Sequence, residues 1–167
     1  MLGYICKYAP IEILESMGAV MKRIEPQVSN FNQADTLMHP NICSFAKGIL
    51  EEVLAGGYEG VILTTCCDSI RRLYDVLKEQ LPDRFIYMLD TPRITGDGGA
   101  ALYEKRILEM AEAYKKFSGR TFCLSAFQNL LQERTAARAE DNASKEGRIS
   151  IGIAGARASE SLKSVLR

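Results

Sequence analysis

Short β-rich runs alternate along this chain with amphipathic stretches of helical period, and this alternation constrains the fold more than any other feature of the sequence. The run over residues 61–65 is β-branched and apolar enough to be buried on both faces, as the strands of parallel sheets are. We therefore expect an α/β fold, with a parallel-sheet layered domain of the Rossmann-like or flavodoxin-like type. The expected strands are residues 2–6, 19–24, 61–65 and 85–89.

Apolar side chains at helical spacing predict the helices between these strands. Pro10 opens the first helix and Gly18 ends it, while Asp68 is a suitable N-cap for a later one. A glycine-rich turn over residues 96–99 precedes the longest stripe. Residues 25–41 are polar and irregular, so we expect a long loop there, of the kind that often carries function. The expected helices cover residues 10–18, 42–57, 68–81, 103–119 and 124–143.

The order of these elements predicts three parts of the chain. Residues 1–120 are expected to form the α/β domain, and residues 121–147 a helical connector that is highly charged at its far end. Residues 148–167 read as the opening strand and helix of a truncated second α/β domain. A lone strand and helix bury too little surface to be stable separately. Either this last part packs back onto the first sheet, or the rest of the second domain is missing.

The balance of charge excludes some classes of partner. The 21 basic residues match the 21 acidic ones, so no global field favours nucleic acid or an anionic membrane. No apolar run approaches the roughly 20 residues of a membrane span. The first residues lack the features of a signal peptide, so we expect a cytoplasmic protein. The odd number of cysteines, five, argues against a disulfide framework.

Two cysteines occupy comparable positions in the expected fold. Cys43 begins a helix, and Cys67 lies between a strand and a helix. Helix N-termini favour the thiolate over the thiol, and ligands of parallel sheets gather beyond the carboxyl ends of the strands. Two thiolates so placed could converge on one soft metal centre. The alternative, a buried apolar thiol, stays open for both residues and is the expected state of Cys6 and Cys123.

Other motifs carry less information. Cys66 and Cys67 point in different directions if they lie in a strand-to-helix turn, so only one is expected to be a ligand. A zinc site made by His39, Cys43 and one of the paired cysteines is chemically feasible, but it lacks the compact knuckle of structural zinc. His39 could equally cap the helix that follows. The glycine-rich runs at 96–100 and 152–156 lack the dinucleotide fingerprint and the Walker lysine, which argues against NAD and ATP binding.

Three segments together resemble a known family. They are GYICKYAPIEILESMGA at residues 3–19, HPNICSFAKGILEEVL at residues 39–54, and GVILTTCCDSIRRLYDVL followed by FIYMLDTPR within residues 60–93. In this order they resemble the subunits of 2-hydroxyacyl-CoA dehydratases, of benzoyl-CoA reductases and of the related double-cubane cluster proteins. The resemblance covers nearly the whole chain.

The resemblance implies a 4Fe–4S cluster held by cysteines between α/β domains. Cys43 matches the first ligand of the family and Cys67 the second, better than Cys66 does, while Cys6 and Cys123 match none. The family takes its third cysteine from a C-terminal domain, and this chain is expected to end before it. His39, Asp68 and Arg71 are expected beside the site. No catalytic residue can be assigned.

The implied function is that of a subunit or fragment of an oxygen-sensitive 2-hydroxyacyl-CoA dehydratase, which removes water from an acyl-CoA through a ketyl radical. The implied partners are a second subunit or a second copy of the chain, and an ATP-dependent activator protein that donates the electron. The chain alone is not expected to be active. Alternatives are a component of a benzoyl-CoA or double-cubane reductase, and an α/β binding or scaffold domain without a cluster. A thiol redox protein based on Cys66 and Cys67 is the weakest reading, because a vicinal disulfide is strained.

Overall fold

The computed structural model of the chain describes residues 1–28 and 30–143. The second domain predicted from residue 148 onwards, with its strand at 149–153, therefore lies outside the described residues. In chain order the described elements are β1 (Leu2–Tyr4), α1 (Ile11–Ser16), β2 (Met21–Arg23), α2 (Asn32–Leu37), α3 (Ser44–Leu54), β3 (Gly60–Thr64), α4 (Asp68–Gln80), β4 (Phe85–Leu89), α5 (Asp97–Ser118) and α6 (Leu124–Ala143).

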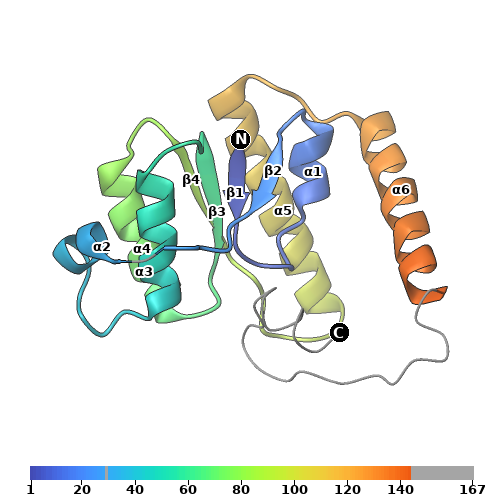
Figure 1. The fold of residues 1–167 in the computed structure, drawn as a ribbon. Coiled ribbons are helices and arrows are strands. Elements are labelled where there is room, and N and C mark those ends of the chain that lie inside the picture. Colours follow the sequence, from blue (N-terminus) through green and yellow to red (C-terminus); the bar gives the residue numbers. More distant parts are fainter. Residues whose placement is uncertain (29, 144–167) are drawn as a thin grey trace. The chain divides into compact units, whose positions relative to one another are not determined.

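The strands form one parallel sheet in the order β2-β1-β3-β4 (Figure 1). Tyr4 of β1 lies opposite Arg23 of β2 on one side and opposite Ile62 of β3 on the other. After β2 the chain crosses β1 to reach β3, so the direction in which strands are added reverses between β1 and β3. This order confirms the predicted parallel α/β fold, and its switch point, beyond the carboxyl ends of β1 and β3, is where such folds bind ligands.

Each face of the sheet carries its own apolar core. Val61 and Leu63 of β3 pack into the core on the α3 and α4 side, whereas Ile62 packs into the core on the α1 and α5 side (Figure 1). The alternation follows from the two-residue period of a strand. All five residues of β3 are buried, which confirms that this strand is covered on both faces. The chain segments that follow β1 and β3 thus begin at strands that are held in the buried part of the sheet.

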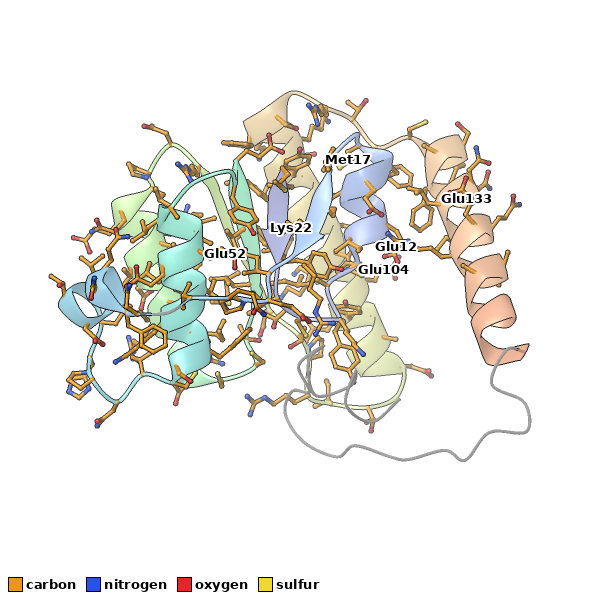
Figure 2. All side chains as sticks on the ribbon, in the orientation of Figure 1. Glu12, Met17, Lys22, Glu52, Glu104 and Glu133 are labelled. Atoms are coloured by element: carbon orange, nitrogen blue, oxygen red, sulfur yellow. The ribbon has the colours of Figure 1, made fainter. Side chains whose placement is uncertain are left out.

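The edge strand β2 is tied to α3 by a polar cluster (Figure 2). The Nζ atom of Lys22 lies 3.7 Å from a carboxylate oxygen of Glu52, and the hydroxyl of Tyr58 donates a hydrogen bond to the same oxygen. The Lys22 ammonium also lies over the Tyr58 ring, 5.5 Å from its centroid. These contacts fix α3, which begins one residue after Cys43, against the sheet.

Several boundaries differ from those predicted. The loop expected over residues 25–41 contains the short helix α2, because a carboxylate from α3 caps its first turn. Asp68 is the first residue of α4 and not its N-cap; Cys67 holds the N-cap position. The turn expected over residues 96–99 is shorter, since α5 already begins at Asp97, after Gly96 with a φ of 83°. The first strand ends at Tyr4, which leaves Cys6 in the following loop.

The chain divides into two compact units, Met1–Gln128 and Asn129–Arg167. The helix expected over residues 124–143 is confirmed as α6, which begins in the first unit and continues into the second. Among the described residues, no helix is both long enough and apolar enough to cross a membrane.

Candidate functional site

Four of the five cysteines lie at the carboxyl edge of the sheet. Cys6 lies two residues beyond the end of β1, and Cys66 and Cys67 lie in the turn between β3 and α4. Cys43 directly precedes α3, the helix that leads into β3. The N-terminus of α3 lies at this carboxyl edge of the sheet. Cys43, Cys66 and Cys67 are exposed, whereas Cys6 is half-buried. The topology therefore brings thiols from three connections to the edge at which α/β sheets bind ligands.

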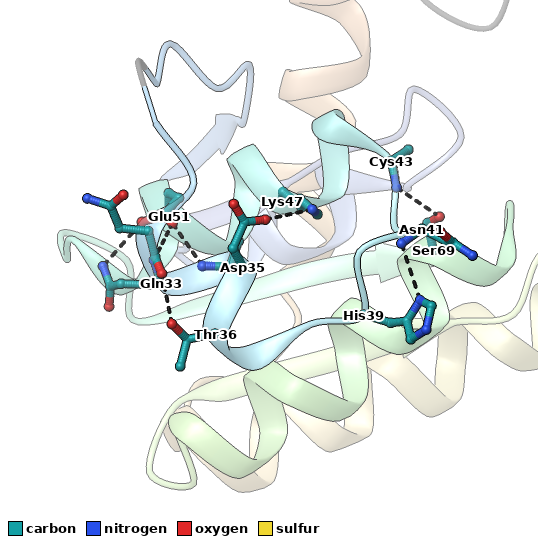
Figure 3. A network of polar contacts seen from close by, with 11 residues as sticks. Gln33, Asp35, Thr36, His39, Asn41, Cys43, Lys47, Glu51 and Ser69 are labelled. Atoms are coloured by element: carbon teal, nitrogen blue, oxygen red, sulfur yellow. Dashed lines mark hydrogen bonds and ion pairs between the residues drawn. The ribbon is translucent and has the colours of Figure 1, made fainter.

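Cys43 is the N-cap residue of α3, and its backbone joins two helix starts. Its carbonyl accepts the hydrogen bond of the Lys47 N–H at 3.1 Å, which closes the first turn of α3. Its own N–H points to the hydroxyl oxygen of Ser69, 3.5 Å away, in the first turn of α4 (Figure 3). The side chain of Cys43 makes no cap hydrogen bond to the helix, so its thiol can bind another group.

Cys67 occupies the matching position at the start of α4. It has an extended backbone, with φ −159° and ψ 168°, and its carbonyl accepts the N–H of Arg71 at 3.2 Å. As in Cys43, the side chain makes no cap hydrogen bond. Because Ser69 follows Cys67 by two residues, the contact between Ser69 and Cys43 brings the N-termini of α3 and α4 together. Both cysteines therefore lie at the positively polarised ends of helices.

Cys66 has a different environment from its neighbour. Its N–H donates to the carbonyl of Thr64 at 2.7 Å, which folds the turn back on the strand. Although the residue as a whole is exposed, burial of its sulfur raises the pKa of the Cys66 thiol; the Thr64 hydroxyl acts in the opposite sense, and Cys67 and Cys6 add to the rise. The surroundings of Cys66 therefore disfavour its thiolate.

The three residues expected beside the site lie in the turn before α3 and near the start of α4. His39 accepts the backbone N–H of Asn41 on its Nδ1 atom at 3.2 Å, so one side of its ring is engaged in the turn before α3 (Figure 3). Asp68 is exposed in the first turn of α4, where a carboxylate is favoured by the helix dipole. Arg71 is exposed one turn further along the same helix.

Cys123 departs from expectation. It is exposed, so the prediction of a buried apolar thiol is wrong. The residue lies in the short link between α5 and α6, where Phe122 beside it is also exposed. The sulfur lies 3.3 Å from the hydroxyl of Ser125, and this contact, followed by the backbone N–H of Ala126, lowers the pKa of the Cys123 thiol. Cys6, in contrast, is partly buried against the core on the α3 and α4 side.

Sequence reasoning missed the residues that hold the cysteine turn in place. The hydroxyl of Thr65 donates to Asp90 at 2.8 Å, and the N–H of Thr91 donates to the same hydroxyl at 3.2 Å. Ser69, which approaches Cys43, was missed as well. The sequence around a threonine or serine does not identify a distant hydrogen-bond partner. Asp90 is far from Thr65 in the sequence, and Cys43 is far from Ser69.

The donors at this edge fit an iron–sulfur cluster only in part. Cys43 and Cys67 are exposed soft donors at adjoining helix starts, which suits thiolate ligation. Within residues 1–28 and 30–143, however, no group of three or more His, Cys, Asp or Glu side chains could hold a metal ion. The zinc site considered for His39 and Cys43 is therefore not formed. The described residues offer two exposed soft donors at adjoining helix starts and no complete ligand set.

Comparison with known protein families places most of the chain within a family model. A sequence model of the family described as 2-hydroxyglutaryl-CoA dehydratase, D-component, matches residues 6–143 of the 167. No curated protein matches the chain. The matched region contains all five cysteines and every described element from α1 to α6.

Proposed function

The chain belongs to the 2-hydroxyglutaryl-CoA dehydratase D-component family, and we propose that it is an iron–sulfur component of a 2-hydroxyacyl-CoA dehydratase in which Cys43 and Cys67 are two of the cluster ligands. The observation that carries the proposal is the contact between Cys43 and Ser69, because it joins two helix N-termini that each present an exposed thiol. Cys66 is the less suitable ligand, since the raised pKa of its thiol disfavours the thiolate.

The protein's own part in the chemistry is to hold the thiolates and to orient them. When bound, a 4Fe–4S cluster supplies one-electron chemistry for removing water from a 2-hydroxyacyl-CoA. The N-termini of α3 and α4 place a partial positive charge beside the two cysteines, and neither side chain makes a cap hydrogen bond. The buried strand β3 fixes the start of the Cys66–Cys67 turn.

We further propose the partners that this chemistry needs. The two ligands of the described part require at least one more from elsewhere, which a second subunit or a second copy of this chain would supply. An ATP-dependent activator protein would deliver the electron, and an acyl-CoA would be the substrate. A cytoplasmic location suits oxygen-sensitive thiolate chemistry. A benzoyl-CoA reductase or double-cubane reductase component would use the same cysteine edge.

One observation favours a second candidate function. No group of three donors that could hold a metal exists in the described part of the chain, as expected for an α/β binding or scaffold domain without a cluster. The test is iron and acid-labile sulfide content, with a visible spectrum, on anaerobically purified protein. Iron with broad absorption near about 400 nm supports the first proposal, whereas colourless protein supports the scaffold.

Matched variants identify the ligands. Cys43→Ser and Cys67→Ser should each lose the iron, and Cys123→Ala should keep it, because Cys123 lies in the link between α5 and α6, away from the turns that carry the other two. A normal iron content in Cys67→Ser would refute the assignment of that residue.

A further inference from the structure

The turn that carries Cys66 and Cys67 is fastened to the neighbouring strand through one side chain. Thr65 is the first residue after β3, and its N–H donates to the carbonyl of Leu89 at 3.1 Å. Its hydroxyl donates to the Oδ1 atom of Asp90 at 2.8 Å and accepts the N–H of Thr91 at 3.2 Å. The hydroxyl thus donates one hydrogen bond to the segment that follows β4 and accepts another from it.

The two cysteines have no comparable anchor of their own. Cys66 donates its N–H to Thr64, inside the turn, and Cys67 accepts from Arg71, inside the helix that follows. At the N-cap of α4, the Cys67 side chain makes no cap hydrogen bond. In the part of the chain that the structure describes, the hydrogen bonds between residues 65–67 and either β4 or the segment after it all involve Thr65.

Asp90 is itself oriented from a third element. Its Oδ2 atom lies 3.8 Å from the Nε atom of Arg106 on α5, and the Nη1 atom of that arginine lies 2.8 Å from Glu109. The carboxylate therefore faces Thr65 with one oxygen and Arg106 with the other. This arrangement connects the cysteine turn through the end of β4 to the long helix on the other face of the sheet.

We propose that Thr65, held by Asp90, is the positioning residue of the cysteine turn, setting where the sulfurs of Cys66 and Cys67 point. The proposal rests on the proposed function, in which one of those sulfurs is a cluster ligand. Thr65 is half-buried and the Asp90 side chain is 52% exposed, while the core beneath β3 is buried completely. A pair so close to solvent contributes little to overall stability, so its main effect is local geometry.

The experiment measures how fast iodoacetamide labels each cysteine in the iron-free full chain at one pH, by mass spectrometry. In Thr65→Val and Asp90→Ala, labelling of Cys66 should rise about fivefold, as loss of one hydrogen bond to the turn typically allows. Thr65→Ser and Asp90→Asn keep a donor or acceptor and should stay near the wild type. Cys123 is the internal reference in every sample.

One further variant separates positioning from general weakening. Ser16→Ala removes a buried hydroxyl that donates to the Ile13 carbonyl at 2.6 Å in α1, away from the turn, and should leave Cys66 labelling unchanged. Wild-type labelling in folded Thr65→Val, or an equal rise in Ser16→Ala, would overturn the proposal. If Thr65→Val does not fold, Asp90→Ala decides by the same criteria.

Iron uptake after anaerobic reconstitution with ferrous iron and sulfide gives the second readout. Thr65→Val should take up less iron than Thr65→Ser. If the wild type takes up none, the proposed cluster function fails, and the labelling rates still decide whether Thr65 positions the turn.

Discussion

A carboxylate oxygen of Glu51, on α3, accepts the backbone N–H of Ala34, in the first turn of α2, at 2.8 Å. The same oxygen accepts the N–H of Gln33 at 2.7 Å. α2 has six residues and no cap from its own N-cap residue, so it would be marginal alone. Glu51 supplies the missing acceptor and a negative charge at the positive end of the helix. The segment that leads to Cys43 starts from this anchored helix.

Replacing Glu51 should therefore destabilise the protein. Glu51 is 91% buried, and Glu51→Ala leaves two N–H groups of α2 without their acceptor, which should lower the free energy of unfolding by about 2 kcal/mol. Glu51→Gln keeps one acceptor oxygen and should cost less. Urea unfolding measures both. The control is Glu79→Ala on the exposed face of α4, where the change should stay within about 0.5 kcal/mol; equal midpoints for the two alanine variants would contradict the capping role.

Two neighbouring glycines at the start of α5 should respond in opposite ways to alanine. A Cβ on Gly99 would collide with the backbone carbonyl oxygen of Ile94, while a Cβ on Gly98 would meet nothing within 4 Å. Gly99→Ala should thus destabilise the protein by about 1–3 kcal/mol. Gly98→Ala should be neutral or stabilising by up to about 1 kcal/mol, because alanine restricts the unfolded chain. Thermal unfolding compares the two, and a loss of stability in Gly98→Ala would show that the first turn of α5 is packed differently.

The parts of the fold that sequence predicted are those in which local pattern and burial agree. The predicted bounds of β4 and α6 agree with the observed ones. An apolar run between turn residues, as in β4, and a long uninterrupted helical stretch, as in α6, each leave few alternative structures. Gly18 and Gly119 have positive φ angles at the ends of α1 and α5, where only glycine is unstrained. Such signals need no knowledge of distant contacts.

The parts that escaped prediction depend on a distant partner. α2 has a polar sequence and exists because Glu51 caps it from another helix. The exposure of Cys123 also follows from tertiary placement, since its link between two helices leaves the thiol uncovered. At the candidate site, the positions of Cys43 and Cys67 at helix starts could be predicted, but Ser69 and Thr65, which fasten those starts, could not.

Two aromatic residues of α5 contact the same ring and should differ greatly in their contribution to stability. The ring centroids of Tyr114 and Phe117 lie 5.2 Å and 5.4 Å, respectively, from the ring centroid of Phe85 on β4. Tyr114 is 1% exposed, whereas Phe117 is 44% exposed. Tyr114→Ala should therefore cost about 3–5 kcal/mol and Phe117→Ala less than half of that. Chemical denaturation tests this, and similar losses for both variants would mean that α5 covers the sheet in another orientation.

The cysteines should also differ in the pH at which they become reactive. Alkylating agents attack the thiolate, so a raised pKa lowers the reactive fraction at a given pH and a lowered pKa increases it. Burial raises the pKa of Cys66, whereas the Ser125 hydroxyl lowers that of Cys123. As the pH increases, labelling of Cys123 should therefore reach half its maximal rate first, and labelling of Cys66 should follow at higher pH. Mass spectrometry after short pulses of iodoacetamide gives both profiles from one sample. In urea, where both thiols are solvated, the two profiles should converge. A half-maximal pH for Cys66 at or below that of Cys123 in the folded protein would contradict the raised pKa of Cys66, and with it the reason for preferring Cys67 as the ligand of the pair.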